Sequence, residues 1–183
     1  MALALPDPAL DALEALQDEL PVGRAMARGT LHLTLAFLGD QHTAALESID
    51  DELRQLKGAA FDLNLNGVGV FGGRQPRALW VGADAGPELT GLREQTRRAA
   101  RRAGIELARE RFRPHVTIAR FGQRLHGDEV ARIGAFLERN GGFRVNPFEV
   151  DRVTLYQSTL HRDGAVHEVL AEYGLQGFYL PDE

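Results

Sequence analysis

An apolar run early in the chain reads Leu31-His32-Leu33-Thr34-Leu35-Ala36-Phe37-Leu38-Gly39. Side chains along a β-strand alternate between two faces with a period of two. The run therefore predicts a strand over residues 30–38 whose polar face carries His32, Thr34 and Ala36. The opposite face is expected to be apolar and to consist of Leu31, Leu33, Leu35 and Phe37.

A second run of the same kind reads Arg113-Pro114-His115-Val116-Thr117-Ile118-Ala119-Arg120. It predicts a strand over residues 112–121 with His115 and Thr117 on one face. His115 follows His32 by 83 positions (115 − 32), and a loop, a helix and a further strand are expected after each histidine. We therefore expect an α+β fold of two similar lobes, each with helices packed on an antiparallel sheet, and both histidines aimed into a common cleft.

Turn and helix signals divide the rest of the chain. Four helices are expected, the first capped by Asp7, the second capped by Thr43, the third between Pro87 and Gly104, and the fourth ended by Asn140. Further strands are expected over residues 2–5, 61–71, 77–81, 145–150 and 153–160. A hairpin turn at Arg162-Asp163-Gly164 is expected to lead from the last of these into residues 165–169.

The composition limits the class of protein. The 183 residues are 44% hydrophobic and 26% charged, which indicates one large domain or two small lobes with a real core. No apolar run approaches the length of a membrane span, and no basic segment precedes an apolar stretch as in a signal peptide. The chain has no cysteine, which excludes disulfides and thiolate metal sites. We expect a cytoplasmic protein that is a monomer.

The charge of the chain limits its partners. A formal net charge of −5 argues against a protein that coats long nucleic acids, because such binding needs an extended basic surface. A short anionic substrate in a small basic pocket is still compatible with this charge. Arginines are concentrated in the third helix, over residues 93–102. A solvated basic face is the favoured interpretation of that helix, and the steering of RNA is the alternative.

Two histidines and two threonines form a set of groups suited to phosphate chemistry. Imidazole titrates near pH 6.5 and can both give and take protons near neutral pH. One ring can take a proton from an attacking water while the other protonates a leaving oxygen, and each transfer contributes on the order of 10² to 10⁴ in rate. A threonine hydroxyl beside each ring can donate to a non-bridging phosphoryl oxygen. This chemistry needs no metal and no cofactor.

One His-x-Thr in a strand is unremarkable, and it is the second copy that indicates a functional site. Zinc is an alternative for paired histidines, but it usually takes three protein ligands, and His-x-His and His-x₃-His spacings are missing here. The remaining four histidines are expected to lie at the surface, in loops or near a hairpin: His42, His126, His161 and His167.

Residues 32–39 and 112–120 resemble the two signature motifs of the 2H phosphoesterases. Within that superfamily the chain is most similar to the bacterial LigT/ThpR group, the RNA 2′,3′-cyclic phosphodiesterases also called 2′-5′ RNA ligases. The likeness extends to residues 71–80 and 155–160 and so covers almost the whole chain. It implies that residues 1–183 form a single bilobal domain whose motifs line a central cleft.

The resemblance also implies an activity and a set of roles. The activity is metal-independent hydrolysis of RNA 2′,3′-cyclic phosphate ends to 2′-phosphates, with a weak, reversible 2′-5′ joining of RNA ends. His32 would protonate the 3′ leaving oxygen, His115 would activate water, and Thr34 and Thr117 would hold phosphate oxygens. Arg120 matches an arginine expected near the phosphate. Strict alternation places Arg120 opposite His115, so it reaches the cleft only if the strand ends or bulges there.

Two other functions are compatible with the sequence. The first is a phosphodiesterase for a small cyclic nucleotide such as a cyclic phosphate of ADP-ribose, which would use the same four residues with different cleft walls. The second is a non-catalytic module that binds RNA ends. Two complete His-x-Thr sets argue against the second, because a pure binder needs no pair of proton carriers. The expected substrates are therefore RNA 3′ ends or small cyclic nucleotides.

Overall fold

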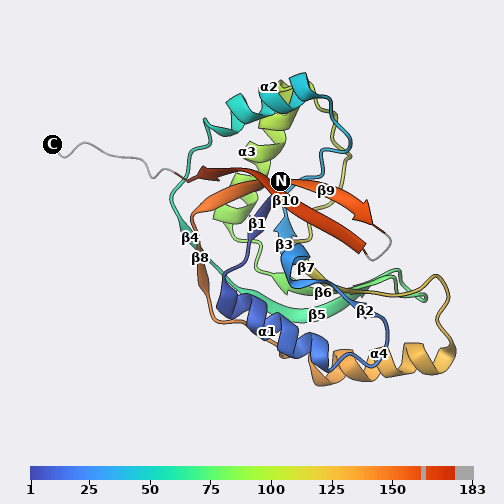
Figure 1. Ribbon diagram of the computed structural model, residues 1–183. Helices are drawn as coiled ribbons and strands as arrows, with labels where there is room; N and C mark the ends of the chain where they lie inside the picture. Colours follow the sequence, from blue (N-terminus) through green and yellow to red (C-terminus); the bar gives the residue numbers. More distant parts are fainter. Residues whose placement is uncertain (162–163, 176–183) are drawn as a thin grey trace.

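The computed structural model describes residues 1–161 and 164–175, which form an α+β protein (Figure 1). Within these residues an eight-stranded antiparallel sheet has the order β10-β9-β1-β3-β7-β6-β5, with β2 also paired to β7. A separate two-stranded sheet pairs β4 with β8. The strands are β1 (Ala2–Ala4), β2 (Arg24–Ala25), β3 (His32–Thr34), β4 (Phe61–Leu63), β5 (Leu65–Phe71), β6 (Ala78–Ala83), β7 (His115–Arg120), β8 (Phe148–Val150), β9 (Arg152–His161) and β10 (Gly164–Gly174). The helices are α1 (Asp7–Asp18), α2 (Thr43–Leu53), α3 (Pro87–Arg102) and α4 (Gly127–Arg139), with a 3₁₀ turn at Arg28–Thr30.

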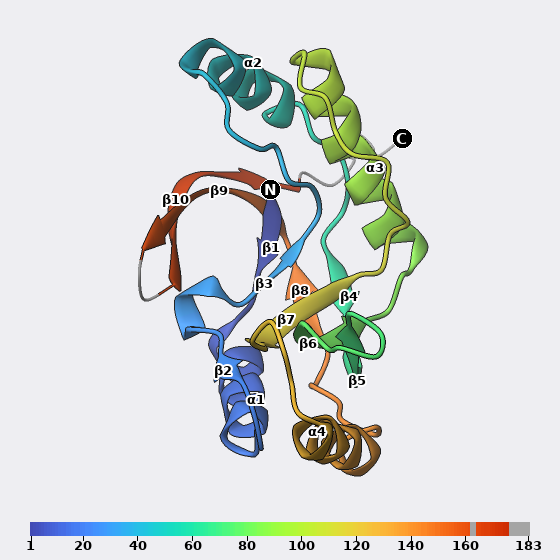
Figure 2. The same cartoon turned by 90° about the vertical axis from the view of Figure 1, so that its right-hand side faces the viewer.

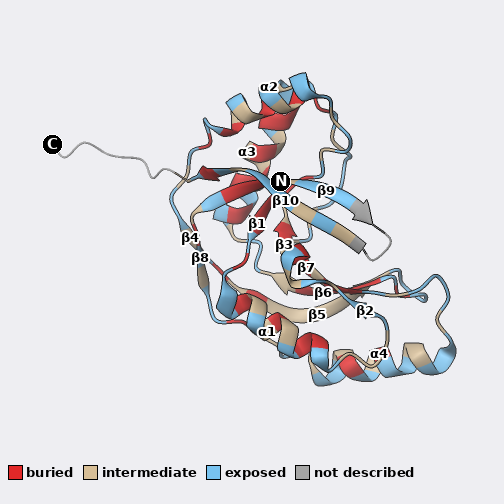
Figure 3. Ribbon diagram, viewed as in Figure 1, coloured by how far each residue is buried: buried red, intermediate tan, exposed pale blue. Residues whose placement is uncertain are grey.

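The two motif strands, β3 and β7, are neighbours at the centre of the large sheet. They pair antiparallel with Leu33 opposite Val116. This register places His32 across from Thr117 and Thr34 across from His115. Leu33 and Val116 are fully buried, and Figure 3 shows both strands within the buried centre of the molecule. The predicted apolar backing is therefore confirmed for Leu31, Leu33 and Leu35 in the first motif and for Val116 and Ile118 in the second.

The order of elements repeats on the two sides of this central pair. The first half runs β1, α1, β3, α2, β4, and the second runs β6, α3, β7, α4, β8. Helix α2 packs against α3, and α1 lies beside α4, where an ion pair joins Glu19 to Arg139 (Figures 1 and 2). The outer strand beside β1 is β9, from late in the chain, and the one beside β6 is β5, from earlier. The predicted two-lobed α+β fold is confirmed, with the lobes interlocked by these outer strands.

The first motif strand is shorter than residues 30–38. The 3₁₀ turn delays its start. At the other end the Leu35 amide continues the register with β1 by donating to the Met1 carbonyl, but the Ala36 amide donates to the same carbonyl, so regular pairing ends there. The alternation of faces therefore holds as far as Leu35 and stops there, because Leu35 and Ala36 are both buried. Phe37, predicted on the buried face, is 78% exposed, so that prediction is wrong. The second motif strand likewise spans residues 115–120 and not 112–121.

Two predicted helix caps are wrong by one residue. Pro6 is the N-cap of α1 and Asp7 is its first residue, with no side-chain cap. His42 precedes α2, and its Nδ1 accepts from the Ala45 amide, a role predicted for Thr43. The expected strand over residues 61–71 divides into β4 and β5, which belong to different sheets. Residues 162–163 of the predicted turn lie outside the described residues.

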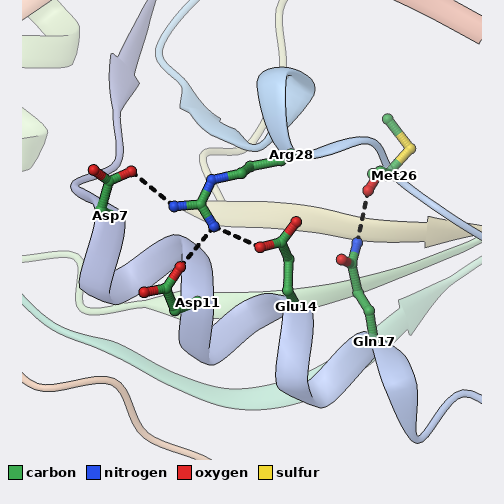
Figure 4. Close-up of polar contacts among 6 residues, drawn as sticks. All are labelled: Asp7, Asp11, Glu14, Gln17, Met26 and Arg28. Atoms are coloured by element: carbon green, nitrogen blue, oxygen red, sulfur yellow. Dashed lines mark hydrogen bonds and ion pairs between the residues drawn. The ribbon is translucent and has the colours of Figure 1, made fainter.

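A cluster around Arg28 fixes the segment that leads into β3 (Figure 4). The Arg28 guanidinium pairs with carboxylates from one face of α1, spaced by four and three residues: Asp7 at 2.7 Å, Asp11 at 2.7 Å and Glu14 at 2.5 Å. These contacts are partly solvent-exposed, so we assign them a role in orientation more than in stability. They hold the 3₁₀ turn immediately before His32 against α1.

A second contact from α1 joins the segment after β2 to the second motif strand. The Gln17 side-chain amide donates to the carbonyl of Met26, 2.9 Å away, on the approach to β3 (Figure 4). The same nitrogen donates to the carbonyl of Ile118 in β7, 2.7 Å away. Because buried carbonyls need a donor, this one side chain ties together the first helix, the segment that leads toward β3, and β7.

Candidate active site

The cleft consists of two cavities that meet at the first motif. We call the first the His32 cavity, which has a volume of about 420 Å³ and is lined by His32, Thr34, Phe37, Asp40, Tyr156 and His167, among others. We call the second the His115 groove, which has a volume of about 380 Å³ and whose lining includes His115, Phe71, Arg93, Arg97, Arg111 and Arg113. Thr34, Ala36 and Phe37 line both. The predicted common cleft is thus divided by the end of β3.

His32 sits in an aromatic enclosure formed by the last two strands. Its ring stacks on Tyr156 of β9 with centroids 5.6 Å apart, and the ring of His167 of β10 lies 4.9 Å away. A hydrogen bond to the backbone of Thr30 also holds the ring. Burial lowers the pKa of His32 to about 4, and the imidazoles of His167 and His115 add to this effect. In the free protein His32 is therefore neutral near pH 7.

His115 is held in the same way but faces a more open space. Its Nδ1 lies 2.6 Å from the carbonyl oxygen of Arg113, two residues earlier, as Thr30 is to His32. A carbonyl only accepts hydrogen bonds, so in the neutral ring Nδ1 carries the hydrogen and Nε2 is left as a proton acceptor. The ring of Phe71 meets the imidazole edge-on at a centroid distance of 4.8 Å. The geometry thus suits His115 to the role of base.

The two threonines are placed differently. Thr34 lines both cavities and lies across from His115 in the register of β3 and β7. Thr117 is half-buried and lies opposite Trp80 of β6. Among the lining residues that the structure describes, Thr117 borders neither the His32 cavity nor the His115 groove. The structure therefore places Thr34 in the cleft and Thr117 beside it.

Arg120 ends β7 beyond an irregularity in the ladder. Leu79 pairs with Ala119 while the next residue, Trp80, pairs with Thr117, so Ile118 is an extra residue opposite β6. Ile118 and Ala119 are both buried and Arg120 is exposed. An extra residue reverses the alternation, which turns Arg120 toward the face of His115. Nevertheless, in the described part of the chain Arg120 lines neither the cavity nor the groove.

Three cleft residues had not been assigned to the site from the sequence. Strict alternation predicts Phe37 on the buried face, but the alternation ends before this residue. Tyr156 lies in residues 155–160, which only the family resemblance connects with the site. His167 had been predicted at the surface, and this is wrong: it is half-buried, faces His32, and has a buried Nδ1 with no hydrogen-bond partner among the described residues. His42 and His126 are exposed, as predicted.

Metal-binding clusters and membrane-spanning helices are both absent from the described residues. No group of three or more histidine, cysteine, aspartate or glutamate side chains is placed to hold a metal ion in residues 1–161 and 164–175. No helix in those ranges is long and apolar enough to cross a bilayer. The groups that the cleft presents include imidazoles, hydroxyls, aromatic rings and guanidinium groups.

Two His-x-Thr strands paired at the centre of a two-lobed antiparallel fold define a 2H phosphoesterase. The model of one protein family, the 2′-5′ RNA ligase superfamily, matches residues 5–162. The chain belongs to that superfamily. The family resemblance and the fold class predicted from the sequence are both confirmed.

Individual relatives agree with this membership. The chain is 31% identical to an RNA 2′,3′-cyclic phosphodiesterase of Aeropyrum pernix over 144 residues, 77% of this chain and 80% of the relative. It is 30% identical to an RNA 2′,3′-cyclic phosphodiesterase of Aquifex aeolicus over 161 residues, 85% of this chain and 84% of the relative. The fold matches that of TT0787 of Thermus thermophilus with a TM-score of 0.78 at 24% identity, over 97% of both chains. It matches Escherichia coli LigT complexed with 3′-AMP with a TM-score of 0.74 at 25% identity, over 96% of this chain and 95% of that one.

Proposed function

We propose that the protein, acting as one domain over residues 1–183, hydrolyses RNA 2′,3′-cyclic phosphate ends to 2′-phosphates. The observation that carries the proposal is the pairing of Leu33 with Val116, which sets each motif histidine across from the other motif's threonine. A tetrahedral phosphate between the strands would then meet one proton carrier from each side. The relatives named RNA 2′,3′-cyclic phosphodiesterase support this choice of substrate.

The proposed reaction is one in-line displacement at phosphorus. Nε2 of His115 takes a proton from water, whose oxygen forms the new bond to phosphorus. The bond from phosphorus to the ribose O3′ breaks on the opposite side, and His32 gives O3′ its proton. Hydroxyls of Thr34 and Thr117 donate to the non-bridging oxygens, where negative charge concentrates. The product is a 2′-phosphate with a free 3′-hydroxyl, and the same path with an RNA 5′-hydroxyl in place of water joins two ends, or reverses that joining.

The state of His32 adds a condition to this mechanism. With a pKa of about 4, the free ring carries no proton to donate near pH 7. A phosphate anion that enters the same desolvated space favours the charged imidazole and raises its pKa. His32 would therefore be protonated as the substrate binds. The pKa of the acid should accordingly be higher in the pH profile of kcat, which reports the complex, than in that of kcat/KM, which reports the free enzyme.

Product analysis tests the proposal directly. An RNA oligonucleotide with a 2′,3′-cyclic phosphate end is incubated with wild type, His32→Ala and His115→Ala in EDTA. We expect a 2′-phosphate from wild type and a large loss in both variants. His126→Ser is the matched control, because it removes an exposed histidine outside the cleft and leaves a good capping residue before α4.

Each other outcome has a distinct meaning. A 3′-phosphate product would reverse the orientation of the ribose and the roles of the two leaving oxygens. Loss of activity in EDTA with rescue by a divalent cation would overturn the metal-independent mechanism. Turnover of a small cyclic nucleotide with none of RNA would move the substrate to that class, and tight RNA binding without turnover would indicate a binding module.

A further inference from the structure

The His115 groove has a charge opposite to that of the whole protein. Four arginines line it: Arg93 and Arg97 from α3, and Arg111 and Arg113 from the loop that leads into β7. Glu110 is the one acidic side chain among the described lining residues. The chain as a whole carries a formal net charge of −5, so the groove is a positively charged region on a negatively charged protein. The His32 cavity differs, since Asp40 is the one acidic or basic side chain that lines it apart from its histidines.

Two of these arginines build the groove. Arg93 is buried, lies with its guanidinium carbon 4.4 Å from the centre of the Phe112 ring, and has a nitrogen 3.4 Å from the Glu110 carbonyl. Arg97 donates to the carbonyl of Ala108 at 2.8 Å. Both side chains thereby fasten the loop before β7 to α3. This loop is held in place before any ligand arrives, which reduces the entropy cost of binding.

The other two arginines are left free to contact a ligand. Arg111 and Arg113 are exposed, and each borders both the His115 groove and a neighbouring cavity beside Phe71 and Trp80. Neither guanidinium has an ion-pair or hydrogen-bond partner within residues 1–161 and 164–175. Phe37, with 78% of its surface exposed, stands at the junction with the His32 cavity. Unpaired cations interleaved with open aromatic rings are what single-stranded nucleic acid sites use.

We propose that the His115 groove binds the single-stranded RNA attached to the reacting end. Arg111 and Arg113 contact backbone phosphates, and Phe37 offers its ring to a base. Which end of the strand lies at His115 rests on the proposed function, whereas the affinity of the groove for RNA does not. The groove makes an oligonucleotide a better substrate than a mononucleotide, because the oligonucleotide brings further backbone phosphates to Arg111 and Arg113, whereas the mononucleotide brings only its cyclic phosphate.

Binding is measured first, without any reaction. A 5′-labelled single-stranded RNA of about eight nucleotides, ending in a 3′-hydroxyl, is titrated by fluorescence anisotropy at several salt concentrations. The Arg111→Gln/Arg113→Gln variant should bind roughly tenfold more weakly. The slope of log affinity against log salt should fall by about 1.4, or about 0.7 for each phosphate of the single strand that the variant leaves unneutralised.

The matched control removes two positive charges from a different place, the exposed face of α3. Arg98 and Arg101 are exposed and line neither cavity in the described structure. Arg98→Gln/Arg101→Gln should keep the wild-type affinity within about twofold, apart from the weak long-range effect of net charge. Equal losses of RNA affinity in the two variants would show general charge attraction and would overturn the proposal that the groove binds RNA. Unchanged melting temperatures confirm that both variants are folded.

Turnover then tests the effect on substrate choice. The KM of a 2′,3′-cyclic mononucleotide divided by that of a cyclic-ended oligonucleotide should exceed one in wild type and approach one in the Arg111→Gln/Arg113→Gln variant. A ratio that the variant leaves unchanged would overturn the proposal. If wild type hydrolyses neither substrate, the proposed function fails, and the anisotropy data alone still decide whether the groove binds RNA.

Discussion

His32 and His115 occupy equivalent places in a repeated motif, yet their surroundings differ. Each ring is held by the backbone two residues before it, and each lies across from the other motif's threonine. His32 is enclosed by Tyr156 and His167, and its pKa falls to about 4. His115 instead borders a groove rich in arginine. The comparison shows that the repeated motif supplies the two histidines, while the residues around each histidine set its pKa and its surrounding charge.

The outer strands are the origin of the difference. On the His32 side, β9 and β10 form a long curved hairpin that supplies Tyr156 and His167 (Figure 2). On the His115 side, β5 and β6 bring Phe71 and Trp80. Gly69 lies opposite Trp80, and a side chain there would collide with the indole. The indole therefore lies over Gly69, with its centroid 6.3 Å from that of the His115 ring.

The largest expected effect on kcat/KM comes from replacing each motif histidine in turn. His32→Ala and His115→Ala should each lower kcat/KM by about 10² to 10⁴, because each removes one proton transfer. The double variant should lose much less than the product of the single losses, since the two groups act in one step. Steady-state kinetics on a cyclic-ended oligonucleotide measure all three. Fully multiplicative losses would mean that the histidines act in separate steps.

A second prediction concerns stability against pH. Between about pH 6.5 and 4 the unfolded chain protonates His32 while the folded chain does not, so protons favour unfolding in this window. Folding stability should therefore fall as the pH drops through it, by up to about 3 kcal/mol from His32. The burial-lowered pKa of His167 acts in the same direction. Urea unfolding of wild type and His32→Gln across this window should show a smaller fall in the variant, and equal falls would contradict the buried neutral His32.

The two threonines allow a sharper comparison of the two motifs, with smaller expected losses of kcat/KM. Thr34→Val removes a hydroxyl that lines both cavities and should lower kcat/KM by roughly ten- to a hundredfold, the value of one hydrogen bond to a charged group. Thr117→Val should lower it less, because Thr117 borders neither cavity in the described structure. Kinetics of the two isosteric variants give the ratio. A greater loss at Thr117 would mean that the bound phosphate lies nearer β7 than the cavities indicate.

The smallest effect is expected at His167. His167→Phe keeps an aromatic ring beside His32 and removes the second imidazole, so the pKa of His32 should rise toward its usual value. Histidine proton resonances followed through a pH titration measure this shift. Asp40 and Tyr156 also face the cavity and are unchanged in the variant. We expect kcat/KM to change by less than about tenfold. A constant pKa of His32 would mean that its lowering comes from burial, the N-terminal amine and His115 and not from His167.

Much of the fold and half of the site follow from local patterns in the sequence. Alternation with a period of two identified the shared faces of His32 with Thr34 and of His115 with Thr117. The recurrence at 83 residues predicted the two-lobed α+β arrangement, and helical spacing located all four helices to within a few residues. These features are predictable because they depend on residues close in the chain, or on an apolar face that is buried whichever element packs against it.

What the sequence by itself determined is the chemistry of the motif and the element order. Only the tertiary structure decided where the alternation of the first motif stops: the Ala36 amide donates to the same Met1 carbonyl as the Leu35 amide, and Phe37 beyond them is exposed. It also decided that His167, distant in the chain, encloses His32. A pKa depends on everything that surrounds a group in space, so the difference between two identical motifs arises only when the outer strands have folded over one of them.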